Sequence, residues 1–254
     1  KSILGSSSSG LSEEQKTIVK NLIANVDGNQ KVSGNQEVTG NGTVGGNQTV
    51  KGDSTVNGTS TSKDNHVTNN STVDGKLTAG SEEVKGDSTV GGNSNIKGDS
   101  TVEGSQTVKG DSTTEGNNTT NGNSTVKGDS TVEGSQTVKA DSTIEGNNTT
   151  NGSSTVKGDS ITEGNNTTNG SSTVKGDSIT EGNNTTNGNS TVKGDLDVEG
   201  STNLKDTTVD GALDVTGNAT INGSSTVKGD STVEGSQTVK GDSITEGNNT
   251  TNGN

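Results

Sequence analysis

The chain has 254 residues, a net charge of −14 and no Phe, Tyr, Trp, Met, Cys or Pro, and only 18% of its residues are hydrophobic. An ordinary globular core of this size is excluded, because aromatic and long aliphatic side chains supply most of the area that such a core buries. The acidic balance argues against nucleic-acid binding through a basic surface. No apolar stretch approaches the ~20 residues that membrane insertion requires.

The N-terminal segment, residues 1–11, opens with two apolar residues, Ile3 and Leu4, and then runs through a Ser-rich stretch between Gly5 and Gly10. This composition is typical of a flexible linker behind a small apolar docking point. We therefore expect residues 1–11 to attach the chain to a larger particle through Ile3 and Leu4.

Residues 12–25 predict one short amphipathic helix. Ser12 and Gln15 have the spacing of a capping box, and an apolar stripe with coiled-coil spacing follows. Such a helix is marginal in water on its own. Two interpretations stay open: three copies form a brief coiled coil that aligns the chains, or the helix caps the end of a solenoid. The stripe residues, which we expect to serve attachment or register, are Ile18, Val19, Leu22 and Ile23.

Residues 26–254 repeat a six-residue unit such as Ser-Thr-Val-Lys-Gly-Asp, with Gly two places after the aliphatic residue. A six-residue period predicts one short strand and one turn per unit, and therefore an all-β β-helix or β-solenoid. The period loses one residue near 57–67, 74–78 and 205–209, where we expect a bend, bulge or altered turn rather than a domain boundary. The inward column that we expect to hold the assembly together includes Val26, Val32, Val38, Val84, Val102, Val126, Val156, Val192, Val215, Ile221 and Val233.

Within each unit, alternate side chains share a face. The column residue and the residue two before it should point inward, and the Thr between them outward. The Gly should allow a turn with positive φ, and the Asp, Asn or Ser after it suits a corner. Units such as Ser160-Ile161-Thr162 exchange Thr and the aliphatic residue. Either these Ile side chains are exposed or the strand rotates locally.

Two architectures fit this pattern. One chain could wind a triangular β-helix with three units per coil, or three chains could wrap around a common axis. The small apolar area favours an interwound homotrimer, whose chains cannot separate without unwinding. A block that begins at Ser100 also recurs five units later, from Ser130, whereas a single-chain coil would prefer multiples of three units. The predicted fold is therefore an elongated, interwound homotrimeric β-helical fibre opened by a short helix.

The run Leu-Asp-Val-Thr-Gly-Asn-Ala-Thr-Ile-Asn-Gly, from Leu213 to Gly223, resembles the shaft repeats of bacteriophage tail and head fibres. The resemblance covers residues 26–254. It implies a homotrimeric shaft on the virion surface, with one end on the particle and the other held toward the host cell surface to aid attachment. The chain lacks the aromatic-rich tip of a complete fibre.

Other functions receive less support from the sequence. The spacing also resembles the hexapeptide repeat of β-helical acyltransferases, but there Gly more often follows the aliphatic residue directly. His66 has only Asp64 nearby as an orienting partner, and no long insertion forms a cleft, so we predict no enzyme and no cofactor. Lys beside most Gly-Asp pairs disfavours calcium. A bacterial extracellular stalk or adhesin shaft and an ice-binding β-solenoid remain alternatives, although Thr119 and Thr120 must point to opposite sides.

Overall fold

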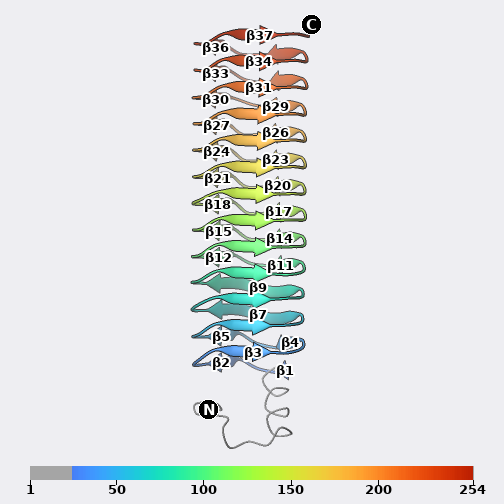
Figure 1. Ribbon diagram of the computed structural model, residues 1–254, viewed down its shortest axis with the longest axis vertical. Helices are drawn as coiled ribbons and strands as arrows, with labels where there is room; N and C mark the ends of the chain where they lie inside the picture. The colour runs from blue at the N-terminus through green and yellow to red at the C-terminus, as the bar shows by residue number, and fades with distance from the viewer. Residues whose placement is uncertain (1–24, 254) are drawn as a thin grey trace, which may run out of the picture.

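A computed structural model describes residues 25–253 of the chain. These residues form stacked coils of three short strands each, with no helix among them (Figure 1). The fold is an all-β parallel solenoid of about thirteen coils, since one of its faces is a sheet of 13 strands. The all-β repeat fold predicted from the six-residue period is confirmed. The predicted helix lies outside the described residues except for Asn25, which begins the first strand.

Each coil contributes one strand to each of three faces, which we call the first, second and third face in chain order. The first face contains β1 (Asn25–Val26), β4 (Gly42–Val44), the start of β7 (Ser60–Val67) and of β9 (Leu77–Val84), β11 (Ser94–Ile96), β14 (Ser112–Thr114), β17 (Ser130–Val132), β20 (Asn148–Thr150), β23 (Asn166–Thr168), β26 (Asn184–Thr186), β29 (Thr202–Leu204), β32 (Ala219–Ile221) and β35 (Gln237–Val239).

The second face contains β2 (Gln30–Val32), β5 (Gln48–Val50), the ends of β7 and β9, β12 (Ser100–Val102), β15 (Asn118–Thr120), β18 (Gln136–Val138), β21 (Ser154–Val156), β24 (Ser172–Val174), β27 (Ser190–Val192), β30 (Thr207–Val209), β33 (Ser225–Val227) and β36 (Ser243–Thr245).

The third face, turned to the viewer in Figure 1, contains β3 (Gln36–Val38), β6 (Ser54–Val56), β8 (Ser71–Val73), β10 (Ser88–Val90), β13 (Gln106–Val108), β16 (Ser124–Val126), β19 (Ser142–Ile144), β22 (Ser160–Thr162), β25 (Ser178–Thr180), β28 (Leu196–Val198), β31 (Leu213–Val215), β34 (Ser231–Val233) and β37 (Asn249–Thr251).

One chain closes every coil by itself. Ser124 pairs with Ser142, and Ser142 with Ser160, so each strand lies parallel to the strand three units later in the same chain. This is the single-chain architecture; the interwound trimer favoured by the sequence argument is not shown. Backbone hydrogen bonds between successive coils stabilise a singly wound chain in addition to the small apolar area that it buries. The block that recurs after five units is no obstacle either, because equivalent units fit any face: Ser100 lies on the second face and Ser130 on the first.

Three shortened corners account for the losses of period. A normal corner has three residues, but Lys63-Asp64, Gly80-Ser81 and Lys205-Asp206 have two. All three join the first face to the second, and the two earlier ones are spanned by the continuous strands β7 and β9. The second lies a few residues beyond the predicted 74–78. Ala79, rather than Thr78, is the buried column residue there, because Thr78 is the outward centre of its three-residue strand segment.

In most normal corners the last residue links its coil to the next one. The Oδ1 atom of Asp141 accepts a hydrogen bond from the backbone N–H of Asp159 (3.0 Å), and Asp159 does the same for Asp177 (2.9 Å). Asn and Ser act alike, as Asn147 does for Asn165 (2.9 Å). Each of these side chains therefore satisfies an amide that the corner would otherwise leave to water, which explains why Asp, Asn and Ser fill the position.

The corner glycines are required for close approach rather than for backbone handedness. None of the corner glycines from Gly28 to Gly253 adopts the left-handed region, so the predicted turn with positive φ is wrong. A Cβ atom on Gly164 would lie 2.6 Å from the carbonyl oxygen of Gly146 in the coil below. The Gly164 N–H donates to that same oxygen over 3.1 Å. The stacked corners are thus too close for a side chain at most of these positions.

Candidate functional site

The predicted assembly column lies inside the solenoid. Its residues are buried, except that Val26 and Val32 are half-buried in the first described coils. Contacts between successive coils join the column into hydrophobic clusters, one of which runs from Val138 to Val233. Beyond Val26 and Val32, the column residues named from the sequence are Val38, Val84, Val102, Val126, Val156, Val192, Val215, Ile221 and Val233, and each is buried.

The second inward position is polar, and its side chains bond to one another inside the coil stack. The Asn148 Nδ2 atom donates to Oδ1 of Asn166 (2.9 Å), and Asn166 donates to Asn184 (3.4 Å). Such bonds matter because a buried amide without a partner costs about 1–3 kcal/mol. In most strands the interior therefore alternates one apolar residue with one amide or hydroxyl group, a composition with far less apolar area than an ordinary core.

Glu82 is a carboxyl group that the sequence analysis did not single out. It is buried and accepts hydrogen bonds from the hydroxyls of Ser88 (3.0 Å) and Ser100 (3.2 Å). Burial raises its pKa, and the two hydroxyl bonds oppose that rise. The signal was present in the sequence: Glu82 occupies the position two before Val84, which the alternation places inside.

The outward residue at the centre of each strand is Thr on most of the surface. On the first face this rank of strand centres contains only Thr and Asn, from Asn25 to Thr238. On the third face, Thr gives way to Ile161 and Ile179, which are 36% and 37% exposed, while Thr162 is 1% exposed. The exchanged units therefore expose Ile, and the strand does not rotate.

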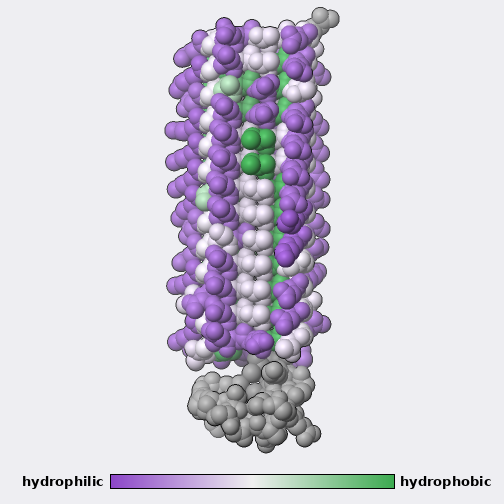
Figure 2. Space-filling model, in the orientation of Figure 1, coloured by the Kyte–Doolittle hydropathy of each residue, from purple (hydrophilic) through white to green (hydrophobic). Residues whose placement is uncertain are grey.

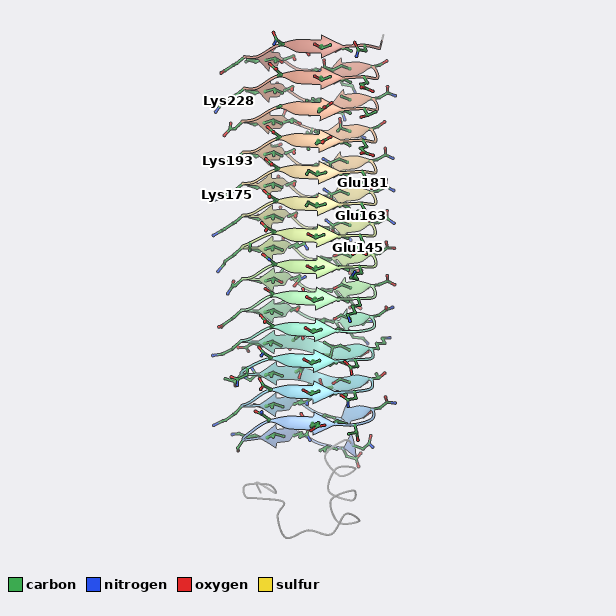
Figure 3. The ribbon with its side chains drawn as sticks, in the orientation of Figure 1. Glu145, Glu163, Lys175, Glu181, Lys193 and Lys228 are labelled. Carbon is green, nitrogen blue, oxygen red and sulfur yellow. The ribbon has the colours of Figure 1, made fainter. Side chains whose placement is uncertain are left out.

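Charged side chains project from the corners. Lys175 and Lys193 lie at the corner between the second and third faces, whereas Glu163 and Glu181 lie at the corner between the third and first faces (Figure 3). Ion pairs within the described residues join Lys127 to Glu145 (3.1 Å) and Lys228 to Asp210 (2.9 Å). The Nδ1 atom of His66 lies 3.0 Å from Oε2 of Glu83. The Lys228 ammonium lowers the pKa of Asp210 through a hydrogen bond.

Neither a catalytic centre nor a metal centre takes shape around the candidates considered from sequence. His66 lies on the second face with Glu83, while Asp64 instead accepts a hydrogen bond from Ser81 (2.9 Å). Within residues 25–253, no group of three or more His, Cys, Asp or Glu side chains gathers in a way that could hold a metal ion. A shallow hollow on the first face, lined by residues such as Asn183, Thr185 and Asn203, offers only amide and hydroxyl groups.

The predicted attachment residues Ile3, Leu4, Ile18, Val19, Leu22 and Ile23 lie outside the described residues. In the part of the chain that is described, no helix has the length and apolarity to span a membrane. No protein-family model, curated protein or solved structure matches the chain.

Proposed function

We propose that the chain is a structural shaft that projects from a larger particle, with a bacteriophage head or tail fibre as the first candidate. One observation carries this proposal: the solenoid is uninterrupted. Its strands all end in corners of two or three residues, and no loop or deep cleft is inserted between residues 25 and 253. Because all the units form regular coils, the chain is an extended, stiff rod. Its length is about 60 Å for thirteen layers at ~4.8 Å each.

Attachment, assembly and location are part of the proposal. Residues 1–25 would join the shaft to the particle, and the far end would point toward the host surface. Electron microscopy of purified particles with an antibody against residues 100–195 tests this. Label along projecting fibres of virions supports the proposal, whereas label confined to the bacterial cell surface favours the stalk or adhesin shaft. Val19→Asp with Leu22→Asp should abolish attachment and leave the coils folded.

The homotrimer stays a prediction from the sequence. The mass of the particle and the length of the rod, measured together, test it. Light scattering combined with negative-stain imaging should give multiples of the 25.2 kDa chain. Three interwound chains would form a rod of roughly 180 Å, because each layer would then use one unit per chain. A rod of about 60 Å means that each chain winds alone. A mass of more than one chain at that shorter length then reports lateral association.

Ice binding is a second candidate because of the uncharged rank of Thr and Asn on the first face. A regular Thr array on a flat solenoid face can match ice. Each strand presents only one outward residue, however, and Lys97, Glu115 and Glu133 stand beside this rank at the neighbouring corner. For a shaft we expect no thermal hysteresis. Measurable hysteresis that Thr149→Lys with Thr167→Lys removes would establish ice binding instead.

A further inference from the structure

The third face between β6 and β25 has an uncharged, β-branched surface. The outward strand centres there are Thr55, Thr72, Thr89, Thr107, Thr125, Thr143, Ile161 and Ile179. Figure 2 shows this rank as a stripe of neutral side chains that ends in two strongly hydrophobic ones. Apart from Ile244 in the penultimate strand, Ile161 and Ile179 are the exposed large hydrophobic side chains of the described residues. Two adjacent exposed Ile in so polar a chain indicate a contact surface.

Opposite charges line the two edges of this face. Glu163 and Glu181 directly follow β22 and β25 at one edge (Figure 3). Lys157 and Lys175 begin the corners that lead into these strands at the other edge, where Asp159 and Asp177 stand next to the strand. Each of these two coils therefore presents an ammonium at one edge only and the Glu carboxylate at the other. On the first and second faces, oppositely charged edges occur in at most two successive coils. The third face has four in succession: Lys139 with Glu145, Lys157 with Glu163, Lys175 with Glu181, and Lys193 with Glu199.

Few of the charged groups in these two columns form ion pairs within the chain. Glu145 bonds to Lys127 at the start of its column, but the later Lys and Glu residues have no opposite charge within 4.0 Å. Asp159 and Asp177 share the Lys corner, where each accepts a backbone N–H along the corner. Like charges stacked coil over coil repel one another. An external surface with the opposite columns would relieve that repulsion.

We propose that the third face binds the third face of a second copy, with the two rods parallel and related by a twofold axis along their length. This rotation places the Lys column of each copy opposite the Glu column of its partner at the same height. It also brings Ile161 and Ile179 against their own equivalents. An antiparallel pair would instead place Lys against Lys. The parallel contact is self-complementary and closes as a dimer.

Asp197 sets the limit of the contact. It follows Ile179 in the same rank, and Asp214 follows it, so each carboxylate would face its own copy. The contact therefore extends from Ile179 toward Thr55, a strip of eight coils about 38 Å long at ~4.8 Å per coil. A strip this narrow belongs with the small, weak interfaces. Its charged edges make the association sensitive to salt.

Sedimentation of the full chain tests the proposal through a charge exchange. We expect a reversible dimer at low salt that weakens at least tenfold between about 0.05 and 0.5 M NaCl. The variant K157E/K175E has carboxylates on both edges of the contact, and E163K/E181K has ammonium groups on both. Each variant alone should be monomeric, and an equimolar mixture should form a heterodimer. As the matched control, N169E/N187E at the opposite corner should dimerise like the parent chain.

Orientation and the apolar contact are tested separately. The chain has no Cys, so Thr125→Cys should form a disulfide-linked dimer under mild oxidation, whereas Thr131→Cys on the first face should not. I161T/I179T, which restores the commoner outward residue, should fold normally and weaken the dimer at least tenfold.

Two results would overturn the proposal: a parent chain that stays monomeric at high concentration, and a dimer indifferent to both charge variants. The length of the rod separates this outcome from failure of the proposed function. A monomer with the length of a singly wound chain would leave the shaft proposal standing. A rod about three times as long would mean that three chains are interwound. The third face described here would then not exist, and the trimer would be supported.

Discussion

Residues 100–141 and 142–195 fold into the same coils but carry different outer surfaces. In the first segment the sequence recurs after five units, so a unit and its copy lie on different faces, as Ser100 and Ser130 do. In the second it recurs after three units, which make up one coil. Asn148 then stacks on Asn166, and Asn166 on Asn184. The fold is the same in both because any unit supplies one inward aliphatic or Thr, one inward polar residue and one corner.

The recurrence length decides the surface chemistry instead. In the first segment Glu103, Asn121 and Lys139 follow one another at one corner, and the charge changes along the rod. In the second segment Lys157, Lys175 and Lys193 continue that corner as one column. A repeat equal to the coil length therefore turns sequence repetition into long stripes of one chemical kind. This difference teaches that the interior tolerates either spacing, while only the coil-length repeat builds a defined surface.

The largest effect should come from a charge placed in the column of either segment. Val102→Asp and Val156→Asp each bury a carboxylate without a partner, which we expect to cost more than about 4 kcal/mol and to unfold the neighbouring coils. Urea denaturation followed by far-ultraviolet circular dichroism, with hydrogen exchange of the flanking strands, measures the loss. Equal losses in the two segments support an interior indifferent to recurrence length; a tolerated Val156→Asp would contradict it.

Two isoleucines in neighbouring strands of the second segment compare a buried position with an exposed one. Ile144 is buried in β19, whereas Ile161 is the outward centre of β22, directly above Thr143. Ile144→Ala should lower the free energy of unfolding by about 2–5 kcal/mol, and Ile161→Ala by no more than about 0.5 kcal/mol. Denaturant midpoints of the two variants provide the measurement. Comparable losses would mean that the strand presents both residues to the core.

The corner glycines of the second segment should be sensitive to substitution. Gly164→Ala forces a Cβ against the Gly146 carbonyl, and we expect a loss of about 1–3 kcal/mol as the coils shift apart. The same change at Gly28, which has open space around its Cβ position, is the control and should cost little. Unfolding midpoints of the two variants provide the comparison. The native chain carries Ala140 at one such corner, so a negligible loss at Gly164 would show that the stack adapts there as well.

Glu82 extends the comparison to an interior residue that lies outside both segments. Replacing it with Gln should change the free energy of unfolding least near pH 4, where the buried carboxyl is protonated. Burial raises its pKa, so the folded chain holds the proton at pH values where the unfolded chain releases it. This stabilisation is full below the ordinary value of 4.5 and is lost as pH rises through the folded-state pKa. Unfolding midpoints should therefore fall over that window. Glu82→Gln should remove this part of the pH dependence of the unfolding midpoint. If the pH dependence is unchanged in this variant, other titrating groups cause it.

The alternation of side chains was predictable from single units, but their environment was not always so. The column and its polar companion could be read from Ser-Thr-Val, because alternate residues of a strand share a face whatever lies beyond it. Glu82 was missed although it stood at an inward position, since the burial that raises its pKa and the hydroxyls of Ser88 and Ser100 that oppose this rise come from the stacking of other strands. The role of glycine was misjudged for a similar reason: the atom that forbids a Cβ at Gly164 belongs to Gly146, one full coil earlier in the chain.

The sequence by itself determined the local conformation: a three-residue strand and a short corner, repeated, with the first and third residues of each strand on one face. That information is local, because strand alternation and corner chemistry depend on neighbours in the chain. Only the tertiary structure decided that three units of one chain close a coil, that Ile161 and Ile179 are exposed, and that Lys and Glu form separate columns. These features depend on which unit stacks on which, and nearly equivalent units leave that choice to the closure of the coil.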